Sequence, residues 1–304
     1  MSIFDVLADV RETREASDRI VPVLLEGLVS SRSIDPPGPD TWFSISKVPT
    51  LCPRTMVIAQ RLNVPLVDAS DAQARWRMDK GSALHSVLQE MWLGPQKLLL
   101  GGWRCPRCGH VHGAAEGITP PFWVADPGAW VTPQSSVLLP DECEKCKLKW
   151  HPMNRFHYVE PWVVSTDLLI RGRTDGVLRL PAHYAEFLDI KTTASLQGVR
   201  YAPRSTDAAQ LQLYMGLSEC RRGRLLYVNP GAKDVQDAMV EHQVDFDPKL
   251  MHEEKEKIRG LRKALSDKTQ PIPRCPYGGK LPFGDCTCVE AAKLWASYGG
   301  RARA

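Results

Sequence analysis

Four of the nine cysteines in this chain occur as two Cys-x-x-Cys pairs, and their spacing constrains how the chain can fold. The first pair is Cys105 and Cys108, the second is Cys143 and Cys146, and 34 residues separate the two pairs. A Cys-x-x-Cys turn presents two thiolates, so two such turns complete a tetrahedral structural metal site with no open position. The sequence therefore predicts a zinc ribbon in this region.

The expected cellular compartment follows from two kinds of segment that the sequence does not show, a signal peptide and a membrane span. Residues 1–19 have no apolar core of the signal-peptide kind, and no run approaches the roughly 18 apolar residues that span a bilayer. A content of 43% hydrophobic and 24% charged residues is typical of a folded protein. We therefore expect a cytoplasmic protein without a membrane partner, whose cysteines bind metal or stay reduced.

Hydrophobic periodicity predicts a mixed α/β core. Helices are expected over 52–62, 71–91 and 207–219, and strands over 158–164, 168–170, 177–180, 185–191 and 225–229. The second helix carries an apolar stripe formed by Leu84, Val87, Leu88, Met91 and Trp92, which predicts its buried face. The third helix is expected to be capped by Ser205 or Thr206.

The segment Asp189-Ile190-Lys191 has the residues of a reactive site. Alternate side chains of a strand share a face, so Asp189 and Lys191 project together while Ile190 points into the core. A carboxylate can hold a divalent cation, and a lysine beside it can orient water or neutralise charge on a phosphate. Thirteen residues separate Asp175 from Asp189, enough for a hairpin to bring the two acids together. Charged strand ends and Asp-Gly turns are common, so neither motif is specific alone.

Two helical positions complete the candidate set. His85 lies at the edge of the apolar stripe, where a lone histidine is more often a hydrogen-bonded core residue than a ligand. Gln210 and Tyr214 are spaced i, i+4 and share one helix face, from which they can jointly hold a backbone or a phosphate. Tyr214 by itself would be an ordinary core aromatic.

The order of these motifs resembles the PD-(D/E)XK nuclease superfamily, specifically its RecB-like branch, which includes CRISPR-associated exonucleases. A histidine on an early helix, Gly-x-x-Asp, Asp-x-Lys and Gln-x-x-x-Tyr follow one another here. The segment 44–54, which starts with serine and ends in Cys-Pro-Arg, is similar to the same branch. The resemblance covers about residues 44–220 and the C-terminal cysteines. It implies an α/β fold with a mixed central sheet flanked by helices, into which the zinc ribbon is inserted.

The resemblance also implies a role for each candidate residue. The expected ligands of Mg²⁺ or Mn²⁺ are the side chains of His85, Asp175 and Asp189 and the backbone carbonyl of Ile190. Lys191 would be the catalytic lysine, and Gln210 and Tyr214 would steady the DNA or the lysine.

Four of the remaining cysteines resemble the iron–sulfur clamp of some RecB-like nucleases, including CRISPR-associated exonucleases and the AddB type. In those nucleases, one cysteine before the core and three after it hold a 4Fe-4S cluster. The resemblance implies that the corresponding residues of this chain are Cys52, Cys275, Cys286 and Cys288. The late spacing departs from the usual pattern, because ten residues separate Cys275 from Cys286 and a single residue separates Cys286 from Cys288. A second zinc ion and unrelated thiols are the alternatives. Cys220 is left over as a spare thiol.

These features predict a nuclease core over 1–98 and 156–304, with its two ends joined by the clamp, and a zinc ribbon over 99–155. The expected activity is that of a metal-dependent DNA exonuclease in phage or prokaryotic recombination, repair or CRISPR adaptation. DNA with a single-stranded end is the expected partner, together with recombination or replication proteins. The alternatives are a non-catalytic DNA-binding scaffold and a structure-selective endonuclease on the same fold.

Overall fold

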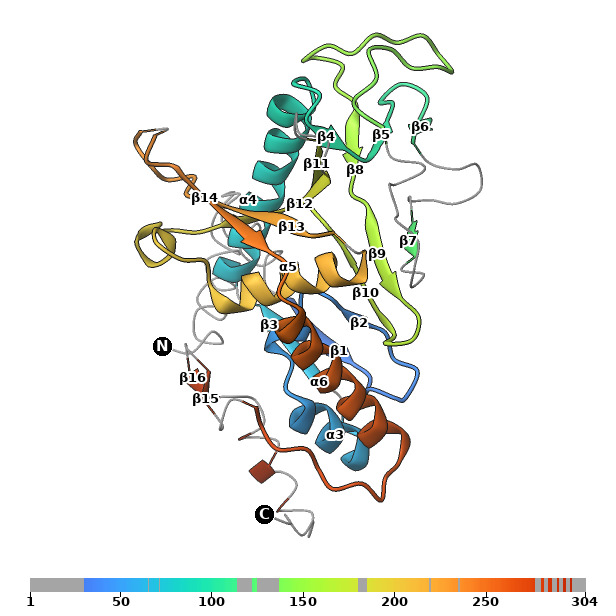
Figure 1. The fold of residues 1–304 in the computed structure, drawn as a ribbon, viewed down its shortest axis with the longest axis vertical. Helices are drawn as coiled ribbons and strands as arrows, with labels where there is room; N and C mark the ends of the chain where they lie inside the picture. The colour runs from blue at the N-terminus through green and yellow to red at the C-terminus, as the bar shows by residue number, and fades with distance from the viewer. Residues whose placement is uncertain are drawn as a thin grey trace, which may run out of the picture.

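The computed structural model has a mixed α/β architecture built on a five-stranded sheet (Figure 1). It describes residues 30–64, 66–70, 72–113, 122–124, 137–179, 185–218, 220–234, 236–276 and a few positions up to 296. The order of the sheet is β14-β13-β12-β11-β4. Its strands are β4 (Leu99–Leu100), β11 (Gly176–Arg179), β12 (Ala185–Thr192), β13 (Arg222–Val228) and β14 (Met239–Asp245). Strands β12 and β13 pair in parallel and the other neighbours are antiparallel.

Smaller sheets surround this central one. A four-stranded sheet has the order β2-β10-β9-β7 and a three-stranded sheet the order β6-β5-β8. Their strands are β2 (Phe43–Ser44), β5 (Gly102–Arg104), β6 (Val111–His112), β7 (Phe122–Val124), β8 (His157–Val159), β9 (Trp162–Ser165) and β10 (Ile170–Arg173). The paired strands β1 (Ser30–Ile34) and β3 (Leu66–Ser70), and β15 (Lys280–Leu281) and β16 (Gly284–Asp285), complete the described strands.

Helices cover both faces of the central sheet. They are α3 (Pro53–Leu62), α4 (Ala72–Val87), α5 (Ser205–Leu217) and α6 (Pro248–Ser266), with short turns η1 (Val48–Thr50), η2 (Leu88–Leu93) and η3 (Gln197–Val199). Helix α4 packs against β12, α5 packs against β12 and β13, and α6 packs against α5 and α3. None of the helices in the described residues is long and apolar enough to cross a membrane.

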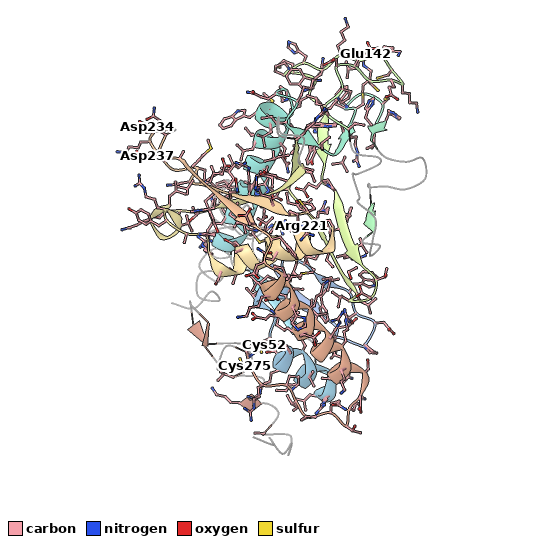
Figure 2. All side chains as sticks on the ribbon, in the orientation of Figure 1. Cys52, Glu142, Arg221, Asp234, Asp237 and Cys275 are labelled. Atoms are coloured by element: carbon pink, nitrogen blue, oxygen red, sulfur yellow. The ribbon has the colours of Figure 1, made fainter. Side chains whose placement is uncertain are left out.

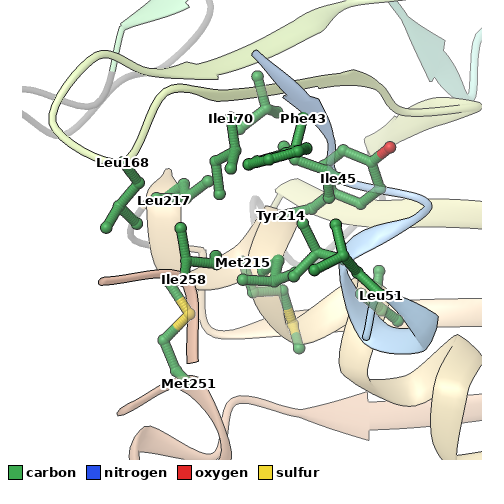
Figure 3. Packing of buried hydrophobic residues seen from close by; sticks show 14 of the residues in the cluster. Phe43, Ile45, Leu51, Leu168, Ile170, Tyr214, Met215, Leu217, Met251 and Ile258 are labelled. Atoms are coloured by element: carbon green, nitrogen blue, oxygen red, sulfur yellow. The ribbon is translucent and has the colours of Figure 1, made fainter. Parts of the chain in front are cut away.

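The alternation of side chains along β12 separates two hydrophobic clusters. Phe187 belongs to the cluster under α5 and α6, which also contains Tyr214 and Met251 (Figure 3). Leu188 and Ile190 belong to the other cluster, which reaches toward η2 and the paired cysteines. Since successive side chains of a strand point to opposite faces, the expected core position of Ile190 is confirmed, with 2% of the residue exposed.

The predicted second helix differs from the observed one at its C-terminal end. Helix α4 ends at Val87 and continues as the π-helical turn η2. The predicted apolar stripe is buried only in part, because Leu88 belongs to the core and Leu84 packs against it, whereas Val87 is 36% exposed and Trp92 48% exposed. Gln89 and Glu90 are buried as well, because a turn with i→i+5 hydrogen bonds rotates the residues beyond it relative to an α-helix.

The expected cap of α5 is also wrong. The N-cap residue is Arg204, and no side chain caps this end. The first turn is instead fixed by β13, because the Tyr227 hydroxyl accepts a hydrogen bond from the Arg204 amide and donates one to Asp207.

Two strand predictions need correction. The segment 158–164 forms two strands, β8 and β9, separated at Glu160 and Pro161, because proline has no N–H for a ladder hydrogen bond. The strand expected at 168–170 begins only at Ile170, since Leu169 has a φ of 50° and lies in a turn.

Strand pairing ties the segment 99–155 to the rest of the chain at both ends. Strand β4, at residues 99–100, pairs with β11 of the central sheet, and β5 pairs with β8 beyond residue 155. The boundaries 1–98, 99–155 and 156–304 stay a prediction.

Candidate active site

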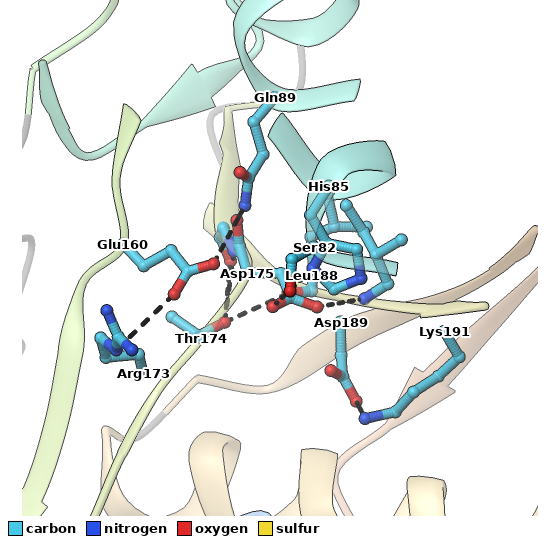
Figure 4. Close-up of polar contacts among 12 residues, drawn as sticks. Ser82, His85, Gln89, Glu160, Arg173, Thr174, Asp175, Leu188, Asp189 and Lys191 are labelled. Carbon is cyan, nitrogen blue, oxygen red and sulfur yellow. Dashed lines mark hydrogen bonds and ion pairs between the residues drawn. The ribbon is translucent and has the colours of Figure 1, made fainter. Parts of the chain in front are cut away.

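Strand β12 places the Asp189 carboxylate next to the Lys191 ammonium (Figure 4). The Lys191 Nζ atom lies 2.9 Å from the Asp189 Oδ2 atom. Asp189 is 3% exposed, and its Oδ2 atom accepts no hydrogen bond from the described residues. The expected arrangement of these two side chains on one strand face is therefore confirmed, and the Asp189 Oδ2 atom lies next to the Lys191 ammonium.

Asp175 lies directly across from this pair, as the hairpin predicts. The register of β11 and β12 pairs Gly176 with Leu188, so Asp175, which directly precedes β11, faces Asp189. The Ile190 amide donates a hydrogen bond of 2.6 Å to the Asp175 Oδ2 atom. The Ile190 main chain therefore contacts Asp175 through its N–H group, and the role of its carbonyl as a metal ligand stays a prediction.

His85 reaches the same point from α4 (Figure 4). Its Nδ1 atom lies 3.4 Å from the Asp175 Oδ1 atom. The structure therefore brings together His85, Asp175, Asp189 and Lys191, which are 106 positions apart at their extremes in the sequence.

Glu160 and Gln89 also line this site, and sequence reasoning missed both. One ligand atom each from His85, Glu160 and Asp175 lie within 4.8 Å of one another. The Gln89 side-chain amide donates to the Asp175 carbonyl at 2.7 Å and to Glu160 at 3.4 Å. Two signals could have found them, the acid before a proline at a strand break and a polar residue four positions after His85.

Gln210 and Tyr214 are buried on the side of α5 that faces β12. The Gln210 Oε1 atom accepts a hydrogen bond of 2.9 Å from Lys191. The Tyr214 hydroxyl donates to the Arg173 carbonyl at 2.7 Å, and the Tyr214 ring packs near Phe187. Gln210 therefore contacts the lysine directly, whereas Tyr214 anchors the end of β10.

Burial and mutual charge shift the titration of these groups in opposite directions. Burial raises the pKa of Asp189 to about 7 with help from Asp175, although Lys191 acts to lower it. Burial also acts to raise the pKa of Asp175, but the hydrogen bond and charge of His85 outweigh it and the net shift is downward. Burial, followed by the charge of Asp175, raises the pKa of Glu160. Asp175 is thus stabilised as an anion, whereas Asp189 and Glu160 bind a proton more readily than an ordinary carboxylate does.

A cleft of about 600 Å³ gives access to His85 and Glu160. Other residues along it are Ser82, Ser86, Gln89, Arg104, His157, Tyr158, Val159, Trp162 and Arg173. Nitrogen side chains of Arg104, His157 and Arg173 line this cleft, and the two guanidinium groups give it positive charge that suits an anionic substrate.

The two Cys-x-x-Cys pairs form a single cluster, in which Cys105 and Cys143 are buried and Cys108 and Cys146 are half-buried. The Sγ atoms of Cys105 and Cys146 lie 3.5 Å apart, those of Cys108 and Cys143 lie 3.6 Å apart, and all four lie within 4.8 Å of one another. Four ligands about 2.3 Å from one tetrahedral ion would be about 3.8 Å apart, so the cluster fits such an ion.

Matching turns build the two halves of this cluster. In the first, the Gly109 amide donates to the Cys105 carbonyl, and in the second the Lys147 amide donates to the Cys143 carbonyl. Gly109 and Lys147 both have positive φ values, of 71° and 58°. Burial acts to raise the pKa of Cys105, but N–H groups of the same turn outweigh it and lower that pKa to about 7, which favours the thiolate that binds metal.

The predicted clamp lies only partly within the described residues. Cys52 is buried at the N-terminus of α3, and Cys275 follows α6. Side chains of α3 hold the end of α6 and the chain after it, through hydrogen bonds from Gln60 to Leu265 and from Arg61 to Gln270. Figure 2 labels Cys52 and Cys275 at the same end of the molecule. Cys286 and Cys288 lie outside the described residues, so a four-cysteine site there stays a prediction.

Comparison with known proteins yields a family and several distant structures. An alkaline exonuclease from Laribacter hongkongensis, LHK-Exo, is 9% identical, with a TM-score of 0.38 over 74% of this chain and 87% of that chain. The crystal structure of SSO0001 is 16% identical, with a TM-score of 0.32 over 73% of this chain and 74% of that chain. A phage-related exonuclease from Haemophilus somnus 129PT is 17% identical, with a TM-score of 0.25 over 32% and 54%.

The comparison with curated proteins finds no match. The model of one protein family, however, matches residues 43–286, which is well over half of the sequence and includes every residue of the acidic site. That family is the PD-(D/E)XK nuclease superfamily, and the chain belongs to it.

Proposed function

We propose that this nuclease is a divalent-metal-dependent DNA exonuclease of the RecB-like branch. The observation that carries the proposal is the Asp175 carboxylate, which Ile190 and His85 hold beside the Asp189–Lys191 pair. Acids, an imidazole and an ammonium that lie together, with the imidazole and Glu160 lining a cleft, suit the hydrolysis of a phosphodiester bond. A scaffold that only bound DNA would have no need of a buried acid pair with a lysine.

The side chains of His85, Asp175, Asp189 and Glu160 would hold the metal ion, with the Ile190 carbonyl as a further ligand. Two observations favour this assignment, the 4.8 Å grouping of His85, Glu160 and Asp175 and the buried Asp189 Oδ2 atom. When bound, Mg²⁺ or Mn²⁺ supplies Lewis-acid stabilisation of phosphate charge, and the imidazole favours Mn²⁺.

The chain's own residues would position and neutralise the reacting groups. The Lys191 ammonium would orient the attacking water and balance the negative charge that develops on the phosphate. Gln210 would fix the lysine through its 2.9 Å hydrogen bond, and Tyr214 would fix β10 beside Asp175.

Mn²⁺ binding is expected to weaken by roughly tenfold or more for each pH unit below 7, because the ion displaces a proton from Asp189. The raised pKa of His85 acts in the same direction, since a protonated imidazole cannot bind metal: burial opposes this shift, but contact with Asp175 outweighs it. Calorimetric titration with Mn²⁺ between pH 6 and pH 8.5 measures the effect. A dissociation constant that stays the same across this range would contradict the assignment of Asp189.

End-labelled linear DNA and covalently closed circular DNA distinguish the proposed exonuclease from its alternatives. With Mn²⁺, the protein is expected to degrade linear strands to short products and to leave circles intact. The exposed-site variant Asp234→Ala is the control for Asp189→Ala, which is expected to be inactive. Nicked or linearised circles would support the endonuclease, and DNA binding without turnover in the parent would support the scaffold.

The two cysteine groups would have separate roles in this enzyme. Cys105, Cys108, Cys143 and Cys146 would hold a structural zinc ion, because four protein ligands leave no open position for chemistry. Cys52, Cys275, Cys286 and Cys288 would hold a 4Fe-4S cluster, which absorbance in the visible range and iron analysis would test. The proposed place of action is the cytoplasm, with proteins of recombination, replication, repair or CRISPR adaptation as partners.

A further inference from the structure

Tryptophan and arginine side chains alternate on the outer face of the sheet beside the cleft. The Arg171 guanidinium carbon lies 5.8 Å from the centre of the Trp42 ring and 5.9 Å from that of Trp162. The Arg173 guanidinium carbon lies 5.5 Å from the Trp162 ring centre. We call Trp42, Arg171, Trp162 and Arg173 the stacking row.

The register of the four-stranded sheet produces this row. Strand β10 lies between β2 and β9, and Arg173 pairs with Trp162 across the β9–β10 ladder. Ile170 and Gly172 of β10 are buried, whereas Arg171 and Arg173 are exposed, as alternation along a strand requires. Trp42 is 36% exposed just before β2. The row therefore offers aromatic faces and cations to an outside molecule, and is not core packing.

The stacking row is continuous with the candidate active site. Trp162 and Arg173 line the same cleft as His85 and Glu160. The Arg173 Nε atom lies 3.7 Å from a Glu160 oxygen, so one side chain contacts both the row and the acidic group. Within the described part of the chain, the Arg171 guanidinium forms no ion pair, which leaves its charge available to a phosphate.

We propose that the stacking row binds unpaired bases of a DNA strand whose backbone passes through the cleft, so that the substrate carries a single-stranded end. Indole faces stack on any base, and guanidinium groups stack on bases and bind phosphates. The bases of a duplex are already stacked and paired, so only an unpaired segment can reach these rings. This inference rests on the proposed nuclease function and adds the residues that would bind the unpaired bases of the expected single-stranded end.

Binding of a fluorescein-labelled 12-nucleotide oligothymidylate, without added divalent cation, tests the proposal. Trp162→Ala is expected to raise the dissociation constant by about tenfold and Trp42→Ala by a few-fold, whereas Trp162→Phe keeps most of the affinity. Trp92→Ala is the matched control, because Trp92 is also exposed but lies outside the cleft lining. A blunt duplex of the same length is expected to bind more weakly than the single strand. Far-ultraviolet circular dichroism and thermal melting verify that each variant folds.

The outcomes separate this inference from the nuclease proposal. Equal affinity of the parent, Trp162→Ala and Trp42→Ala for the oligonucleotide would overturn the stacking row, even in a parent that cleaves DNA. Equal affinity for duplex and single strand would overturn it as well. A parent that binds the single strand through Trp162 but cleaves nothing with Mn²⁺ would support the row and refute the nuclease.

Discussion

Replacing Lys191 by alanine is expected to lower the rate of DNA cleavage by about 10²- to 10³-fold while the variant still binds Mn²⁺. Losses of this size follow the removal of one preorganised group that stabilises charge in a transition state. The Lys191 ammonium is well placed for such a role, at 2.9 Å from both an Asp189 oxygen and the Gln210 oxygen. It is also largely buried, with 21% of the side chain exposed, so water screens its charge little.

Single-turnover cleavage of a labelled strand at pH 8.5 measures the effect and keeps Asp189 ionised. Lys191→Met retains most of the side-chain volume and is expected to lose the same activity, which separates the missing charge from a packing defect. Lys233→Ala changes an exposed lysine after β13 and is expected to match the parent. Cleavage by Lys191→Ala within threefold of the parent would refute the role given to this lysine.

The centre of this site could be predicted because it follows from strand periodicity. Alternation along β12 alone places Asp189 and Lys191 on one face, and a thirteen-residue hairpin then determines which residue lies opposite. His85 was identified by its place in an ordered set of motifs. Its helix pattern alone favoured an ordinary core histidine.

The parts that could not be predicted depend on contacts between distant segments. Gln89 lies four positions after His85, so helix spacing alone places the two side chains near each other, but its hydrogen bonds to Glu160 and to the Asp175 carbonyl join segments that are far apart in the sequence. Glu160 meets His85 only because β8 and β9 separate at Pro161. The prediction of the α5 cap was wrong for the same reason, because the hydroxyl of Tyr227 in β13, and not a local serine or threonine, forms the hydrogen bonds at the start of the helix.

The stacking row is a further case of this kind. Its residues come from β9, from β10 and from the position before β2, and the sequence of each segment gives no sign of the others. An isolated exposed tryptophan is common on protein surfaces and needs no functional explanation. Only the spatial alternation of indole and guanidinium groups, next to acids in a cleft, indicates a binding surface.

Replacing Cys143 by serine is expected to abolish binding of the proposed structural zinc ion and to lower the melting temperature by about 10 °C or more. Binding free energy at a structural zinc site is folding free energy, and a loss of about 4 kcal/mol corresponds to a shift of this size. Cys143 and Cys105 belong to the same buried cluster as Trp103 and Phe156. Without the ion these side chains lose the centre around which their segment packs.

The same cluster extends to Leu188 and Ile190, the neighbours of Asp189 in β12, so the loss is expected to reach the acidic site and reduce cleavage as well. Metal analysis, thermal melting and the nuclease assay measure the three effects on one preparation. Cys220→Ser is the matched control, because the Cys220 thiol donates hydrogen bonds to backbone carbonyls, which a serine hydroxyl can also do, and lies outside both cysteine groups. A Cys143→Ser protein that retains one equivalent of zinc and an unchanged melting temperature would refute the assignment of a zinc ion to these four cysteines.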